Sequence, residues 1–61
     1  MEEEADLNRC DLSGKDLTRA HLVRAKLIAA RLVNATLIDV NLTEADLTDA
    51  KLSGADLTRA I

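Results

Sequence analysis

The chain has 61 residues, a net charge of −3 and 48% hydrophobic residues, with no Phe, Tyr or Trp. A chain this short forms one domain at most and buries only about 60% of its unfolded surface. Cys10 is the single cysteine, which excludes an intrachain disulfide, and Cys10 and His21 alone are too few soft ligands for a structural zinc site. No stretch approaches the roughly 20 apolar residues of a membrane span.

Residues 1–4 (Met-Glu-Glu-Glu) form an acidic tail. This tail lacks the basic and apolar regions of a secretory signal peptide. We therefore expect a cytoplasmic protein whose one domain spans residues 5–61.

Leucine occupies every fifth position of this domain, from Leu7 to Leu57. On a helix, successive leucines would be about 140° apart and would leave no apolar face. On a strand, they would alternate between the two faces. A small residue stands two positions before almost every leucine, on the same side of an extended segment. The pattern predicts a three-residue strand and a two-residue corner, repeated as a solenoid around a Leu/Ala core.

The number of sides in each coil follows from recurring motifs. Charge pairing fits coils of 15 or 20 residues almost equally well. However, "LSG" and "LTRA" both recur after 40 residues, which is two coils of 20 and no whole number of 15s. Coils of 20 also place Gly14, Asn34 and Gly54 in one corner column, and these residue types best tolerate left-handed backbone. A four-sided coil is the better interpretation.

Units such as "ADLTD", "CDLSG" and "NATLI" resemble the A(D/N)Lxx unit of the pentapeptide-repeat proteins, and the resemblance covers residues 5–61. The family implies an all-β fold, a right-handed quadrilateral parallel β-helix, with the leucine and the preceding small residue pointing inward. For this chain it implies a solenoid of about three 20-residue coils, roughly 14 Å tall at about 4.8 Å per coil.

Some positions depart from the repeat. Lys15 stands at a small inward position, where it can lean over the open end of the first coil and stay hydrated. Val40 is large for its inward site, so a bulge is expected there. In the middle coil the residue after leucine becomes aliphatic, which we attribute to β-propensity because the four side chains point to four different sides. These four residues are Val23, Ile28, Val33 and Ile38.

The leucines of the middle of the chain should form the buried core. The predicted core residues are Leu22, Leu27, Leu32, Leu37 and Leu42. The last coil should present an open apolar end, because the sequence stops at Ile61 with no helix to cover it. We expect two such ends to meet across a two-fold axis and form a homodimer. The predicted dimer-end residues are Leu47, Leu52, Leu57, Ala60 and Ile61.

No catalytic, metal or cofactor site is expected. Cys10 fits a small core position and His21 an outward surface position. The period sends nearly all carboxylates to the solvated walls, without the shared burial that a catalytic pair needs. Gly14 and Gly54 stand too far apart in the sequence to form a phosphate-binding loop.

Charge is banded along the chain: residues 1–16 sum to −4, residues 17–36 to +4 and residues 37–61 to −3. Complementary coils explain this pattern. The basic residues are spread over several sides without aromatic side chains, so nucleic-acid binding is not expected. They are Arg19, Arg24, Lys26 and Arg31.

We expect a non-catalytic structural or protein-interaction module whose protein partner is unknown. The alternative, taken from some members of the family, is a DNA-mimicking inhibitor or protector of a type II topoisomerase. The net charge of only −3 argues against that alternative. So does a height of roughly 14 Å, which spans only about four base-pair rises of ~3.4 Å.

Overall fold

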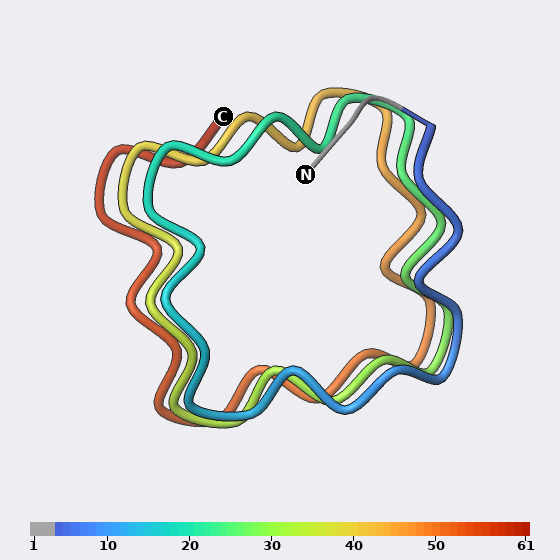
Figure 1. Ribbon diagram of the computed structural model, residues 1–61, viewed down its shortest axis with the longest axis horizontal. Helices are drawn as coiled ribbons and strands as arrows, with labels where there is room; N and C mark the ends of the chain where they lie inside the picture. The colour runs from blue at the N-terminus through green and yellow to red at the C-terminus, as the bar shows by residue number, and fades with distance from the viewer. Residues whose placement is uncertain (1–3) are drawn as a thin grey trace.

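The computed structural model describes residues 4–61, and its backbone follows a four-sided outline (Figure 1). Parallel bridges join residues that lie twenty positions apart in the sequence. The bridges are Asp6–Lys26, Asp11–Arg31, Asp16–Thr36, His21–Asn41, Lys26–Asp46, Arg31–Lys51 and Thr36–Asp56. This register shows that one circuit of the outline takes twenty residues, and it excludes the fifteen-residue alternative.

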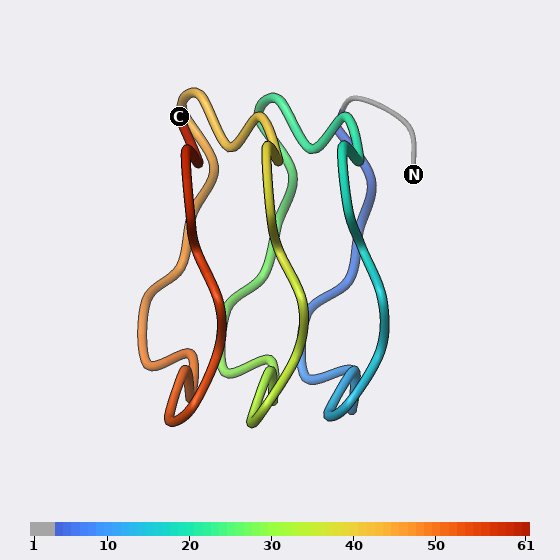
Figure 2. The same cartoon turned by 90° about the vertical axis from the view of Figure 1, so that its left-hand side faces the viewer.

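The bridges stack residues 4–23, 24–43 and 44–61 on one another, and we call these the first, second and third segments (Figure 2). The molecule measures 23 × 21 × 15 Å. The coil axis lies along the shortest dimension, which is the viewing direction of Figure 1. We name the four walls after one bridge residue each: the Lys26, Arg31, Thr36 and His21 walls.

Each wall contributes less extended structure than predicted. Among residues 4–61, the sheet consists of isolated bridges at the residue before each leucine, and the predicted three-residue strands are absent. The reason is that a turn begins at the leucine itself. The Leu27 carbonyl, for example, accepts a hydrogen bond from the Ala30 N–H at 3.1 Å. The extended geometry is therefore interrupted in every five-residue unit.

Every corner of the outline contains a residue with positive φ, two positions after the leucine. Left-handed backbone was predicted for the column of Gly14, Asn34 and Gly54, and their φ values of +70°, +60° and +72° confirm it. The same conformation occurs at the other three corners, for example at Ala29 (φ 59°). A positive φ at the third residue of a four-residue turn is typical of type II turns. The fold thus imposes this conformation on residue types that seldom adopt it.

The bulge predicted at Val40 is absent. Val40 is fully buried, and the preceding corner residue, Asp39, has φ 58°, like the other corners. The Val40 N–H still donates to the Leu37 carbonyl, at 3.2 Å against 2.9–3.1 Å in the other turns. Lys15, the other large residue at an inward position, is exposed.

The buried core is centred on the second segment and extends into the first. It consists of Leu17, Leu22, Ala25, Leu27, Ala30, Leu32, Ala35, Leu37 and Val40. Four of the five predicted core leucines are at most 1% exposed, but Leu42 is only partly buried. The reason is that the leucines of the third segment cover the C-terminal side of Leu27, Leu32 and Leu37, while no described leucine covers that side of Leu42. Leu17 was not predicted as a core residue.

The repeat begins slightly earlier than predicted. Glu4, assigned to the acidic tail, has the φ of a corner residue (61°), and its N–H donates to the Val23 carbonyl at 2.8 Å. The remaining tail residues, 1–3, lie outside the described residues. Residues 4–61 contain no helix of the length and hydrophobicity needed to cross a membrane.

Candidate interaction surfaces

The outward carboxylates hold the corners in place. Asp16 shows the arrangement: its Oδ1 accepts hydrogen bonds from the Thr18 N–H at 3.0 Å and the Thr18 Oγ1 at 2.6 Å. In six repeat units, the aspartate or asparagine just before the leucine accepts a hydrogen bond from the backbone N–H of the residue just after the leucine. They are Asp6–Asn8, Asp11–Ser13, Asp16–Thr18, Asn41–Thr43, Asp46–Thr48 and Asp56–Thr58.

The absence of this hydrogen bond in the middle of the chain explains the aliphatic residues found after the leucines there. The residues before those leucines are His21, Lys26, Arg31 and Thr36, and none of them accepts this bond in the structure. The residues after them are Val23, Ile28, Val33 and Ile38, which have no hydroxyl to donate. The two positions therefore change together, beyond what β-propensity alone requires. The sequence signal was the spacing of Asp and Thr in "DLT" units, and the sequence interpretation missed it.

Opposite charges alternate along two corner columns. Arg24 lies between Glu4 and Glu44, with N–O distances of 3.4 and 3.8 Å. Arg59 donates to Asp39 through Nε at 2.7 Å and through a terminal guanidinium nitrogen at 3.3 Å. Arg24, Arg59 and the two glutamates are largely solvent-exposed and Asp39 is half-buried, so solvent screens these pairs and each stabilises the fold only weakly.

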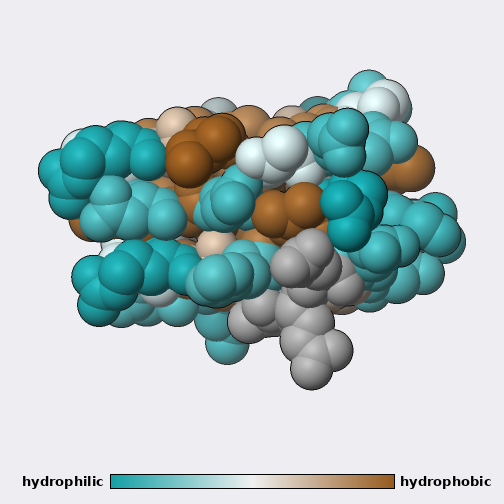
Figure 3. All heavy atoms as spheres, turned by 90° about the horizontal axis from the view of Figure 1, so that it is seen from above, coloured by the Kyte–Doolittle hydropathy of each residue, from teal (hydrophilic) through white to brown (hydrophobic). Residues whose placement is uncertain are grey.

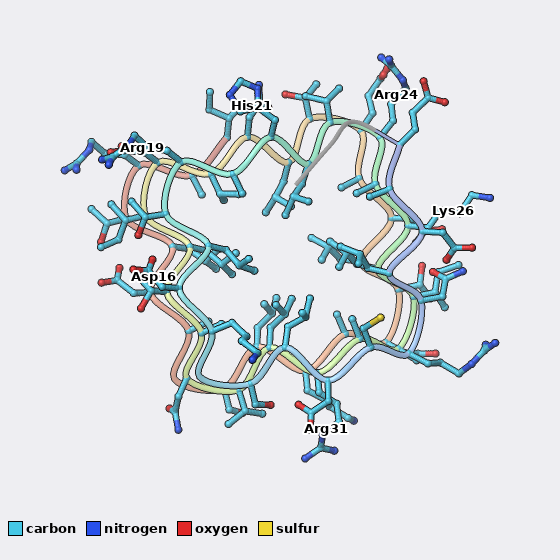
Figure 4. The ribbon with its side chains drawn as sticks, viewed as in Figure 1. Asp16, Arg19, His21, Arg24, Lys26 and Arg31 are labelled. Atoms are coloured by element: carbon cyan, nitrogen blue, oxygen red, sulfur yellow. The ribbon has the colours of Figure 1, made fainter. Side chains whose placement is uncertain are left out.

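The basic residues do not form one patch. Figure 4 shows Arg19, Arg24, Lys26 and Arg31 extending outward from different sides of the outline. His21 is exposed on the His21 wall, and Cys10 is a half-buried free thiol. Among residues 4–61, no three His, Cys, Asp or Glu side chains lie together as a metal site would require.

The C-terminal face of the third segment is apolar and hollowed. A cavity of about 360 Å³ opens there. Its lining consists of Leu22, Leu27, Leu32, Leu37, Leu42, Leu47, Leu52, Leu57, Ala60 and Ile61. Leu57 is 40% exposed and Ile61 is 74% exposed. Figure 3, a view onto the His21 wall, shows hydrophobic spheres reaching the rim opposite the grey residues. The structure thus places all five residues predicted for the dimer end around one cavity.

The family model described as "Pentapeptide repeats" matches residues 3–37 and 25–61, in 8 copies. The chain belongs to the pentapeptide-repeat family. No curated protein matches this pentapeptide-repeat chain.

The chain is also similar to a solved structure, a pentapeptide repeat protein from the thylakoid lumen of Arabidopsis thaliana. The two are 39% identical, with a TM-score of 0.62 over 92% of this chain. The match covers 42% of the Arabidopsis chain, so this chain spans less than half the length of that protein. The similarity implies a right-handed quadrilateral β-helix, in agreement with the four-sided outline in Figure 1.

The corner hydrogen bonds of this pentapeptide-repeat chain make the carboxyl groups that accept them more acidic. The Thr18, Thr48 and Thr58 hydroxyls, followed by their backbone N–H groups, lower the pKa of Asp16, Asp46 and Asp56 respectively. The cause is that both donors bond to the ionised carboxylate and so favour it.

These shifts predict a loss of stability in acid. A carboxyl whose pKa is lower in the folded state stabilises the fold above its unfolded pKa of about 3.9. That contribution disappears as the pH falls below 4 through the folded pKa. We expect the thermal midpoint, followed by circular dichroism from pH 6 to pH 2, to fall over this range.

The control replaces Asp16, Asp46 and Asp56 with asparagine. Asn41 already accepts the same bond from the Thr43 N–H, at 3.1 Å, without a titratable group. The triple variant should therefore keep its corners and lose less stability between pH 5 and pH 2. An acid-induced loss as large as that of the parent protein would contradict the assignment.

Proposed function

We propose that the chain is a non-catalytic protein-interaction module, built as a right-handed quadrilateral β-helix of about three 20-residue coils. Membership of the pentapeptide-repeat family supports a non-catalytic role. The use of outward carboxylates as corner acceptors supports it too, because those side chains maintain the backbone. The cytoplasmic location stays a prediction, since the thylakoid lumen belongs to the Arabidopsis protein.

The proposed contact surface is the C-terminal face, and the proposed occupant is a second copy of the chain. The hollow with Leu57 and Ile61 at its rim is the observation that carries this proposal. Exposed apolar surface around a cavity is a common feature of docking sites. On the same face, the Leu47, Leu52 and Leu57 N–H groups have no acceptor within residues 4–61, whereas the leucines below them donate to the next segment. A partner that docks on this face would meet both apolar side chains and backbone donors.

A second copy supplies matching apolar side chains when the two C-terminal faces meet across a two-fold axis. Each copy then offers a protruding isoleucine and a hollow to the other, as a self-complementary contact requires. Head-to-tail stacking is less favourable. In the register of the existing bridges it would place Asp46 against Asp6 and Asp56 against Asp16.

The test is the molar mass in solution by size-exclusion chromatography with light scattering. At 100 µM we expect about twice the chain mass of 6.6 kDa for the parent protein and the single-chain mass for Leu57→Glu. A charge at Leu57 would have to be buried in the dimer, which is strongly unfavourable.

Two further variants make the test decisive. Ser53→Glu adds the same charge to an exposed position of the third segment outside the cavity lining, so it should remain dimeric. Ile61→Glu changes a residue that is 74% exposed, so it should remain folded while losing the dimer. A folded parent protein with the mass of one chain would overturn the proposed self-association.

The topoisomerase alternative has no supporting observation among the surfaces described. A DNA mimic needs a continuous acidic surface, because the charge that it imitates is repeated along every step of the duplex. Here acids alternate with bases, as in the column of Glu4, Arg24 and Glu44.

A further inference from the structure

The walls differ in how charges stack from one segment to the next. On the Lys26 wall, acid, base and acid alternate as Asp6, Lys26 and Asp46. On the Thr36 wall, a neutral threonine separates two acids. The Arg31 wall differs from both, because its order is Asp11, Arg31 and Lys51, so two cations occupy neighbouring positions beside one acid.

This cation pair has a cost for the fold. Like charges directly opposite each other on a sheet are destabilising. Within residues 4–61, neither Arg31 nor Lys51 takes part in an ion pair. A basic side chain also cannot accept the corner hydrogen bond, so the Val33 and Ser53 N–H groups have no acceptor among the described residues.

An aspartate at position 51 would remove both costs. It would give the column alternating charges with Arg31 in the middle. It would also accept from the Ser53 N–H, as Asp11 does from the Ser13 N–H at 3.1 Å in the first segment of the same wall. Lys51 therefore departs from two local rules at once. In natural proteins such departures are expected at functional sites.

The corner that follows this wall leaves it accessible. Its three residues are Gly14, Asn34 and Gly54, and none of them carries a charge. The other three corner columns each contain at least two charged side chains. Arg31 itself extends away from the outline in Figure 4. Another chain can therefore approach the Arg31 wall from this side without meeting long corner side chains, whereas the preceding corner carries Arg9 and Asp49.

We propose that the Arg31 wall binds an extended acidic segment of a protein partner, with Arg31 and Lys51 each pairing with one carboxylate. Carboxylates on alternate residues of an extended chain lie on one side, roughly 6.6 Å apart. Two long basic side chains on segments about 4.8 Å apart can span that distance. The Val33 and Ser53 N–H groups lie where outward carboxylates accept on the other walls, so they add two donors for the bound segment. This surface lies on a wall and is separate from the C-terminal face.

The test uses a fluorescein-labelled peptide with glutamate and serine at alternate positions, followed by fluorescence anisotropy at low salt. We expect Arg31→Gln and Lys51→Gln each to weaken binding about three- to fivefold, as for an exposed charge pair. Lys26→Gln removes the same charge from another wall and should leave binding unchanged. The peptide with glutamine in place of glutamate should not bind.

Three outcomes would overturn the proposal: no binding of the acidic peptide, equal weakening by Lys26→Gln and Lys51→Gln, or tighter binding of a single-stranded oligonucleotide through the same residues. Ile61→Glu should bind the peptide normally even as a monomer, which separates this test from that of the C-terminal face.

A second measurement addresses stability. Lys51→Asp should abolish peptide binding and raise the thermal midpoint, because it restores charge alternation and the corner bond to Ser53. A lower thermal midpoint for Lys51→Asp would show that Lys51 does not destabilise the fold, which would contradict this part of the proposal.

Discussion

Leu32→Ala is expected to lower the free energy of unfolding by about 3–5 kcal/mol, the largest effect of any truncation considered for this protein. Leu32 is 1% exposed and lies between the leucines of the first and third segments on the Arg31 wall. Truncation removes the burial of a leucine and leaves a cavity that the rigid neighbouring coils cannot fill. Small domains have total stabilities of about 5–15 kcal/mol, so the variant should be close to unfolding.

Two matched leucine truncations test whether the loss of stability depends on the position of the leucine and not only on the Leu→Ala change itself. Leu7 and Leu42 are only partly buried, so Leu7→Ala and Leu42→Ala should each cost less than Leu32→Ala. Urea unfolding followed by circular dichroism measures all three. Equal losses would contradict the core described above, in which the leucines covered on both sides carry most of the stability.

Gly54→Val is expected to cost about 2 kcal/mol or more. Gly54 has φ +72°, a conformation that is strained for a β-branched side chain. In addition, a Cβ at this position would lie 2.0 Å from the Asn34 Oδ1, so the asparagine side chain would have to move. Thermal unfolding at neutral pH measures the sum of these two effects.

Gly14→Val is the matched control, because Gly14 has φ +70° but a Cβ there would meet nothing within 4 Å. It should show the backbone strain alone and lose less stability than Gly54→Val. Adding Asn34→Gly to Gly54→Val should bring the loss back to the Gly14→Val level. If Gly54→Val were neutral, the left-handed corner itself would be in doubt.

The fold was readable from the sequence because its period is unambiguous. A leucine at every fifth residue fits neither a helix nor a strand, and the recurrence of "LSG" after 40 residues selected coils of twenty. The corner conformation was harder to read. It depends on backbone geometry that the coil imposes on any residue type, and only Gly14, Asn34 and Gly54 signal it by their chemistry. The burial of Leu42 was overestimated because burial depends on which leucine stacks above it.

The two candidate surfaces differ in how far the sequence predicted them. The C-terminal face was predicted, since it follows from inward positions that the leucine series defines. The Arg31 wall was not, although the twenty-residue register selected from the sequence already pairs Arg31 with Lys51. In fifteen-residue coils Arg31 would lie between Asp16 and Asp46, and no conflict would arise. The bridge between Arg31 and Lys51 places these two cations in neighbouring positions.

Each coil takes twenty residues but the repeat unit takes only five, so the surface of this protein can change during evolution while its interior stays the same. Inserting one five-residue unit after Ala45 would keep every leucine inward, yet it would rotate all later residues by one wall. Asp46 would then stack on Arg31, and Lys51 would stack on Thr36, so the cation pair would vanish without a single substitution. Gain or loss of one repeat can thus rearrange the surface charges of such a coil while its core composition stays the same.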